Sequence, residues 1–237
     1  MKISVCIATY NGEKFISEQL ASILCQLSSE DEVIISDDSS LDNTIGLIKL
    51  FNDDRIKILE NQNFKNPIFN FENALINSTG DIIFLSDQDD IWLPDKVKLM
   101  KPIVEKSHIV LCNCSVVNEK MEVICQSFFL THHSKSGLWN NMLLRNSYMG
   151  CCMAFSRELL NIALPFPKNI PMHDSWIGLL GEIYFKPIFV EDCLVLYRRH
   201  SYNVSQTGYK SMNPVLKQIR FRVNLLLCLI LRLMKPK

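Results

Sequence analysis

Short apolar runs, each followed by polar residues and then by apolar residues at helical spacing, recur through the first 112 residues. Such runs predict buried strands, and the 3.6-residue spacing predicts helices that pack on them. The predicted strands are 2–8, 33–35, 55–59, 82–85 and 109–112, and the predicted helices are 16–27, 45–51, 69–76 and 94–105. This alternation predicts an α/β fold with a doubly wound, mostly parallel sheet, followed by a smaller mixed C-terminal part.

Polar side chains follow three of these strands at the point where each strand ends. Tyr10 follows the first strand, Asp37 and Asp38 end the second, and residues 87–90 follow the fourth. In open α/β sheets the carboxyl ends of parallel strands border the crevice in which ligands bind. We therefore expect the three polar clusters to meet at one ligand-binding edge.

The stretch from Ser86 to Trp92 carries three carboxylates in four positions, directly after an apolar run. Carboxylates this close repel one another unless a divalent cation neutralises them or water solvates them fully. Oxygen ligands in the pattern Asp-x-Asp, here Asp87 and Asp89, suit Mg²⁺ or Mn²⁺ holding substrate phosphates. The alternative is a solvated loop whose acids favour the start of the helix near Pro94. The convergence of the polar clusters favours the cation site.

The second half of the chain is less regular. The pattern predicts a hairpin at 116–124, a short helix at 137–145, and strands at 149–155 and 194–197, with a helix at 173–183 between them. Asp174 falls in the first turn of that helix, where an anion is stabilised, so it is either a cap or a pre-oriented base. The cations Arg198, Arg199 and His200 follow the last strand, and they either hold a diphosphate or solvate a loop.

Charge is distributed unevenly, although the formal net charge is zero. Residues 193–237 contain nine Lys or Arg and no acidic residue, so the first 192 residues have an excess of nine acidic groups. A basic tail of this kind suits an anionic partner such as phosphate or a lipid surface.

The nine cysteines are an odd number, several lie in apolar runs, and none forms a Cys-x-x-Cys pair. They are predicted to be small core residues in a reducing compartment, and a zinc site is not expected. The N-terminus begins a strand almost at once, without a long apolar segment. No signal peptide is therefore expected.

The segment from Pro214 onward has helical spacing, with basic residues on one side and apolar residues on the other. Its wholly apolar part, 225–231, is far shorter than the roughly 20 residues that span a bilayer. We predict a basic amphipathic helix in the membrane interface. The alternative is a helix that packs on the body or on a second subunit. Residues 1–210 would form one catalytic domain, and 211–237 its tail.

Five segments in order resemble the large inverting glycosyltransferase family 2, with its GT-A fold, over roughly residues 2–206. They are the opening strand and turn at 4–12, the Asp-Asp-x-Ser-x-Asp pattern at 37–42, the metal and nucleotide motif at 87–90, His173-Asp174, and a closing segment at 197–205 similar to that of the bacterial surface-polysaccharide branch. Ser39 stands where the family usually has glycine, which is tolerated if that turn needs no positive φ.

The resemblance implies a role for each matching residue. The donor-binding residues would be Ala8 (through its backbone), Tyr10, Asp38, Asp87, Asp89, Arg199 and His200. Asp87 and Asp89 would also bind the cation, Mn²⁺ or Mg²⁺, with Asp89 the more direct ligand, and Asp174 would be the general base. Residues 1–110 would form the nucleotide-sugar half and residues 111–210 the acceptor half.

Chemistry agrees with these roles, because a departing nucleoside diphosphate needs charge neutralisation and an attacking hydroxyl needs a base. The predicted reaction transfers a hexose or deoxyhexose from a UDP- or dTDP-linked donor, with inversion. The acceptor would be a hydroxyl of a lipid-linked oligosaccharide in surface polysaccharide synthesis of the O-antigen or capsule type. The protein would act in the cytoplasm, peripherally on the inner membrane face, without a nucleic-acid partner.

Parts of the sequence also resemble three other classes of protein. A haloacid-dehalogenase-type phosphatase resembles the Asp-x-Asp pair, but its pair lies on the first strand and precedes Thr or Val, whereas Ile91 follows here. A sugar-nucleotide-forming nucleotidyltransferase needs a Gly-rich basic loop after the first strand, which is absent. A catalytically inactive sugar-nucleotide-binding scaffold is disfavoured by the intact Asp38, Asp89 and Asp174.

Overall fold

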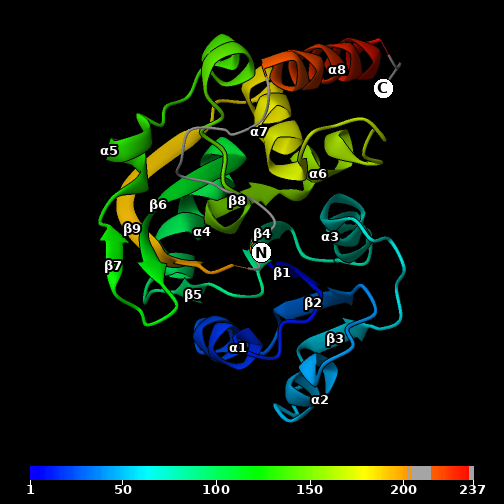
Figure 1. The fold of residues 1–237 in the computed structure, drawn as a ribbon, viewed down its shortest axis with the longest axis vertical. Helices are drawn as coiled ribbons and strands as arrows, with labels where there is room; N and C mark the ends of the chain where they lie inside the picture. Colours follow the sequence, from blue (N-terminus) through cyan, green and yellow to red (C-terminus); the bar gives the residue numbers. More distant parts are fainter. Residues whose placement is uncertain (202, 204–214, 235–237) are drawn as a thin grey trace.

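The computed structural model describes residues 1–201, 203 and 215–234, and its strands form one mixed sheet (Figure 1). The strand order is β3-β2-β1-β4-β8-β6-β9-β5, and β7 pairs with β6. The strands are β1 (Ile3–Thr9), β2 (Glu32–Asp37), β3 (Ile56–Leu59), β4 (Ile82–Asp87), β5 (Ile91–Trp92), β6 (Ile109–Asn118), β7 (Val123–Cys125), β8 (Met153–Ser156) and β9 (Ile188–Arg199). The helices are α1 (Ile16–Leu24), α2 (Thr44–Lys49), α3 (Pro67–Ile76), α4 (Lys96–Ser107), α5 (Phe128–His132), α6 (Arg157–Ala163), α7 (His173–Tyr184) and α8 (Val215–Leu233).

The N-terminal half confirms the predicted parallel sheet. Strand β1 pairs with β2 on one side and β4 on the other, and β3 lies at the edge. The four apolar residues at 82–85 in β4 are fully buried, as expected for a strand covered on both faces. The register places Thr9 opposite Asp37 and Ala8 opposite Asp87. The polar clusters therefore share one edge of the sheet, as the sequence predicts.

In the second half, a long strand returns to that same edge. Strand β9 runs parallel to β6 and is longer than the predicted 194–197 segment. Its last part also pairs with the two-residue strand β5, where Ile91 lies opposite Leu196. Strand β5 was not predicted, because two residues carry no periodicity. The pairing brings the end of β9 beside the acidic loop between β4 and β5.

Several local predictions were wrong. The predicted strand at 149–155 begins with a 3₁₀ turn at Gly150–Cys152, and β8 starts only at Met153. The predicted helix at 137–145 is a single π-helical turn at Asn140–Leu144. The short helices α5 and α6 were not predicted. Asp42 precedes the N-cap of α2, which is Asn43, and its carboxylate accepts a hydrogen bond from the backbone N–H of Thr44 (3.1 Å).

The turn after β2 requires a positive φ. The condition under which serine would replace the usual glycine without cost is therefore not met. Ser39 has φ 61°. This conformation costs a residue other than glycine roughly 1–2 kcal/mol. The Ser39 hydroxyl donates a hydrogen bond to the carbonyl of Gln62, an interaction that glycine does not offer. This contact holds the turn at the carboxyl end of β2.

Helix α8 has one face on the body and another in solvent (Figure 1). Leu225 and Leu229 are buried, and the Arg232 guanidinium donates to the carbonyls of Ile162 and Leu164 (2.6 and 2.8 Å). The exposed apolar side chains of the helix include Leu216, Ile219, Val223, Leu226, Leu227, Ile230 and Leu231. One face of α8 therefore packs on the body, which was the alternative prediction, and the other face is exposed. Among the described residues, no helix combines the length and apolar character needed to cross a bilayer.

Candidate active site

The β1 and β2 ends are fixed by hydrogen bonds around Asp37. Its carboxylate accepts from the Thr9 hydroxyl and from the backbone N–H of Ser40, both at 2.9 Å. The next residue, Asp38, donates its N–H to the Thr9 carbonyl (3.0 Å) and accepts from the Phe64 N–H (2.6 Å). Asp37 is therefore structural, and Asp38 is held at the sheet edge, at the position predicted to meet the donor.

Gln88, in the middle of the acidic motif, closes the gap between β4 and the β1 turn. Its amide accepts from the Tyr10 N–H (2.9 Å) and donates to the Tyr10 carbonyl (3.1 Å). The Tyr10 backbone is thus bound by the Gln88 side chain, whereas Tyr10 itself is 53% exposed. Gly12 approaches the same amide so closely that a Cβ there would lie 2.5 Å from the Gln88 Oε1. The predicted Tyr10 thus lies beside the predicted Asp87 and Asp89.

Asp89 meets two side chains from the end of β9. Its Oδ2 lies 2.7 Å from His200 Nε2 and accepts from the Asn203 amide at 3.1 Å. The His200 ring also stacks on Phe15, with 4.7 Å between centroids. Two predicted donor-binding residues that are 111 positions apart are therefore in contact. Arg199, the third predicted residue of this segment, ends β9 opposite Asn118 of β6.

Arg198 neither solvates a loop nor faces outward. Its side chain is 4% exposed, donates to the Glu18 carboxylate, and lies 4.6 Å from the centre of the Phe15 ring. Its backbone N–H donates to Asp90 Oδ1 (3.0 Å). Arg198 therefore ties the end of β9 to α1 and to the acidic loop.

Asp90 is the most buried member of the acidic motif. It is 0% exposed, and within the described residues its Oδ2 has no hydrogen-bond partner. Burial, together with the nearby Asp89 and Asp87, raises the pKa of this carboxyl well above its usual range. An unpaired buried carboxylate oxygen is costly unless a proton or a cation satisfies it.

The carboxyl of Asp87 is affected by the charge of Asp174 across the site. Burial, followed by repulsion from Asp89 and Asp174, raises the pKa of Asp87 to about 7. Burial also raises the pKa of Asp174 to about 6, against hydrogen bonds that include one from the Ser175 N–H. The predicted metal-binding motif and the predicted base thus lie at the same edge. The position of Asp174 in the first turn of α7 is confirmed.

Three residues around this edge were not predicted. Lys96 is fully buried, donates from Nζ to the Cys151 carbonyl (2.6 Å), and lies 4.0 Å above the Trp92 ring. His173 stacks on Phe71 at 4.2 Å, and burial lowers its pKa to about 3, so it is neutral. The third is Cys151. Nothing in the local pattern separates these residues from a solvated lysine or an ordinary core residue.

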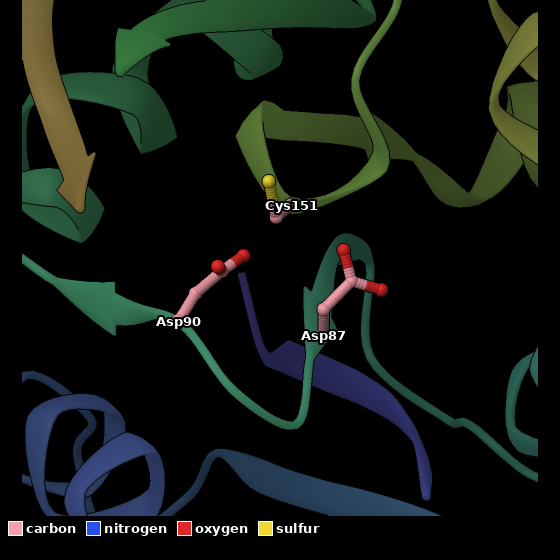
Figure 2. Close-up of side chains that lie close together, drawn as sticks. All are labelled: Asp87, Asp90 and Cys151. Atoms are coloured by element: carbon pink, nitrogen blue, oxygen red, sulfur yellow. The ribbon is translucent and has the colours of Figure 1, made fainter. Parts of the chain in front are cut away.

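A group of side chains at the same edge fits a divalent cation (Figure 2). Figure 2 shows Asp87 at the end of β4, Asp90 just before β5 and Cys151 on the turn before β8, with the Asp90 carboxylate directed toward the space beside Cys151. One ligand atom from each lies within 4.8 Å of the others. The orphaned Oδ2 of Asp90 supports this fit. Asp87 was a predicted ligand; Asp90 and Cys151 were not.

Comparison with protein families gives a match to the model described as "Glycosyl transferase family 2", over residues 4–161. Among curated proteins, the chain is 28% identical over 214 residues to the Escherichia coli protein named UDP-Glc:alpha-D-GlcNAc-diphosphoundecaprenol beta-1,3-glucosyltransferase WfgD. That match covers 89% of this chain and 82% of WfgD.

Two solved structures share the fold. Staphylococcus aureus TarS in complex with UDP-GlcNAc aligns with 96% of this chain at a TM-score of 0.72 and 20% identity. The mannosyltransferase PcManGT from Pyrobaculum calidifontis, in complex with GDP-Man and Mn²⁺, aligns with 99% of the chain at a TM-score of 0.61 and 20% identity. The chain spans 60–67% of the TarS 1–349 chains, 37% of another TarS chain and 65% of PcManGT. The fold is the GT-A type that the sequence predicts.

Proposed function

Because the chain belongs to glycosyl transferase family 2, we propose that its acidic edge transfers a hexose or deoxyhexose, with inversion, from a UDP- or dTDP-linked donor. The acceptor is a hydroxyl of a lipid-linked oligosaccharide in surface polysaccharide synthesis. The observation that carries the proposal is that Asp174, in the first turn of α7, lies near enough to Asp87, at the end of β4, to help raise the pKa of its carboxyl. Asp87 would serve the leaving group and Asp174 the nucleophile. A glycosyltransferase needs both functions at one edge.

The phosphatase alternative is excluded by family membership. In addition, the pair Asp87 and Asp89 lies at the end of β4, not on the first strand.

The donor half is built from the ends of β1, β2 and β4. Asp38, Tyr10 and the Ala8 backbone hold the nucleoside, because all three lie at the carboxyl edge of adjacent strands. Asp87 and Asp89 hold the diphosphate side, with His200 and Arg199 contributing positive charge from the end of β9. When bound there, a divalent cation such as Mn²⁺ or Mg²⁺ supplies charge neutralisation for the departing diphosphate.

Asp174 accepts the proton of the acceptor hydroxyl as that oxygen attacks the anomeric carbon. With a pKa raised to about 6, this carboxyl is mostly ionised at neutral pH and is a stronger base than an ordinary aspartate. The Ser175 N–H holds Asp174 Oδ1 at 2.5 Å and fixes its direction. A single displacement inverts the anomeric centre, so neither Ser86 nor a cysteine serves as a nucleophile.

A thermal-shift panel tests the donor. We expect a UDP- or dTDP-sugar to raise the melting temperature only when Mn²⁺ is present. At a ligand concentration of about 100 Kd the native state gains about 2.7 kcal/mol. For a chain of this size that gain corresponds to about 5–10 °C. GDP-sugars serve as the matched negative set. If no nucleotide sugar shifts the melting temperature with Mn²⁺, the donor assignment is wrong.

The exposed face of α8 provides the contact with a lipid surface. Opposite the buried Leu225 and Leu229, the helix presents apolar side chains, flanked by the exposed cations Lys217 and Arg220. This arrangement suits the boundary between anionic headgroups and acyl chains. It would hold the protein peripherally on the inner face of the cell membrane, where a lipid-linked acceptor lies.

We expect the double variant Leu227→Gln, Leu231→Gln to reduce partition into anionic vesicles at least about tenfold. Each leucine is more than half exposed in the free protein (53% and 63%), and each loses about 1 kcal/mol of transfer free energy or more when made polar. Vesicle co-sedimentation measures the effect. The control is Leu50→Gln, Leu130→Gln, which changes two exposed leucines elsewhere on the surface. Equal partition of wild type and the α8 variant would exclude this face as the membrane contact.

A further inference from the structure

A second exposed apolar segment lies beside α8. The π-helical turn at Asn140–Leu144 packs against this helix, and the Arg222 guanidinium donates to the Leu144 carbonyl at 3.2 Å (Figure 1). Three large apolar side chains here are exposed, namely Trp139 (66%), Leu143 (46%) and Leu144 (69%). These residues, the 139–144 segment, are separated from α8 by about 70 positions in the sequence but adjoin it in the fold. The exposed apolar side chains of α8 therefore have a neighbouring apolar group on another element.

The chain on both sides of the 139–144 segment is anchored on α7. Before it, the Gly137 N–H donates to a carboxylate oxygen of Glu182 (2.6 Å), and after it, the Tyr148 hydroxyl donates to the same oxygen (2.8 Å). The Tyr148 ring also lies so close to Gly178 that a Cβ there would be 2.3 Å from the ring. Helix α7 carries Asp174 in its first turn. The segment is thus fixed to the helix that positions the proposed base.

The charge around these side chains has one sign. Residues 135–146 and 215–234 contain no Asp or Glu. Their cations are Lys135, Arg145, Lys217, Arg220, Arg222 and Arg232. A second copy of the chain that docked through the same surface would bring these like charges together, and they would repel one another. Anionic headgroups neutralise them instead, while the acyl boundary accepts the apolar side chains.

We propose that the 139–144 segment and α8 form one surface that contacts an anionic membrane, with the Trp139 ring at the level of the headgroups. Tryptophan is enriched at that level because its ring is apolar and its N–H is polar. The inference rests on the proposed function for the contact of α8 with the membrane and adds a second contact. A single interfacial helix leaves the body free to roll about the helix axis. Contact at two elements removes this freedom and gives α7, and with it Asp174, a fixed orientation toward a lipid-linked acceptor.

Tryptophan fluorescence of the full-length protein with vesicles tests this surface. The chain has three tryptophans, and Trp92 and Trp176 are buried (2% and 0% exposed), so a change on lipid binding reports on Trp139. With vesicles of phosphatidylglycerol and phosphatidylcholine, we expect the emission to shift to shorter wavelength and brominated acyl chains to quench it. Trp139→Phe should lose both the shift and the quenching, and leave only the emission of the two buried rings.

A second variant measures how much the ring contributes to binding. Trp139→Gln should lower partition into these vesicles at least about threefold, because the transfer of the apolar ring is lost. The matched control is Leu50→Gln, at an exposed residue that follows α2, and it should keep the partition, the shift and the quenching. Circular dichroism checks that each variant is folded. Unchanged partition of Trp139→Gln would contradict the proposal.

The outcomes separate this inference from the proposed contact of α8. Vesicle co-sedimentation without a shift or quenching would overturn the role of the 139–144 segment and leave the α8 contact standing. Quenching that survives Trp139→Phe would overturn it too. A shift that grows with protein concentration in the absence of vesicles would identify a second copy on this surface and exclude the lipid assignment. Failure to sediment with vesicles at all would contradict both membrane contacts, whereas the thermal-shift panel tests the donor independently.

Discussion

Replacing Asp174 by Asn is expected to lower turnover at least about a hundredfold while donor affinity stays within about twofold. The amide keeps the size of the side chain but does not accept a proton, and general-base catalysis contributes about 10²–10⁴-fold. Asp174 lies in the first turn of α7, outside the sheet, so the exchange leaves the strands that carry the predicted donor-binding residues in place. Steady-state turnover and calorimetric donor binding, measured on the same preparation, separate the two effects.

The pH profile gives a second readout of the same residue. Burial raises the pKa of Asp174 to about 6, so the base is ionised above this pH and protonated below it. Wild-type turnover should therefore rise with pH through about 6 and then level off. The surface variant Asp192→Asn should keep both the rate and the profile, because its side chain is exposed. Near-normal turnover in Asp174→Asn would remove this residue from the mechanism.

Asp89→Ala is expected to abolish metal-dependent donor binding, with a loss of at least about a hundredfold in affinity. A cation on a diphosphate contributes several kcal/mol, and this contribution depends on the carboxylates that hold the cation. Removing Asp89 also leaves His200 and Asn203 without their shared partner. Calorimetric titration with donor and Mn²⁺ measures the loss. An unchanged titration would show that Asp89 does not serve the donor.

Two control variants distinguish loss of the Asp89 carboxylate from loss of the contact between Asp89 and His200, which follows β9. His200→Ala breaks the same 2.7 Å contact but keeps the Asp89 carboxylate, so it should weaken donor binding less and leave the Mn²⁺ dependence in place. Asp95→Asn removes an exposed acid five residues after Asp90, at a positive φ that asparagine also tolerates. It should bind donor like the wild type.

The edge of the sheet at which the ends of β1, β2 and β4 meet was largely predictable from the sequence, because each of its parts is a local pattern. An apolar run that ends in Asp37 or Asp87 specifies a strand and its polar end together, and parallel pairing then places those ends side by side. The same reasoning located Asp174, since a carboxylate after a proline-rich break marks the start of a helix. Family resemblance assigned the roles but was not needed to bring the residues together.

The other parts of the site depend on long-range pairing that no local pattern encodes. Asp90 and Arg198 are in contact only because β9 pairs with both β6 and β5. Lys96 falls in the predicted helix 94–105, where the pattern gives no sign that it is buried; its burial follows from the position of the turn before β8, whose Cys151 carbonyl it binds. Five of the nine cysteines are buried core residues as expected, whereas Cys25 is exposed and Cys125, Cys193 and Cys228 are partly exposed. Periodicity also does not reveal that Cys151 lies near two carboxylates.

The late position of β9 in the chain also constrains the order in which the protein matures. During synthesis the acidic loop leaves the ribosome about a hundred residues before Arg198 and His200, which bind it in the native state. Until then its carboxylates stay solvated, because burial without these partners is unfavourable. Pairing of distant strands is slow compared with local folding. A nascent or truncated chain that ends before β9 would therefore have the parallel strands β1 to β4 but an acidic loop that still lacks its native partners Arg198 and His200.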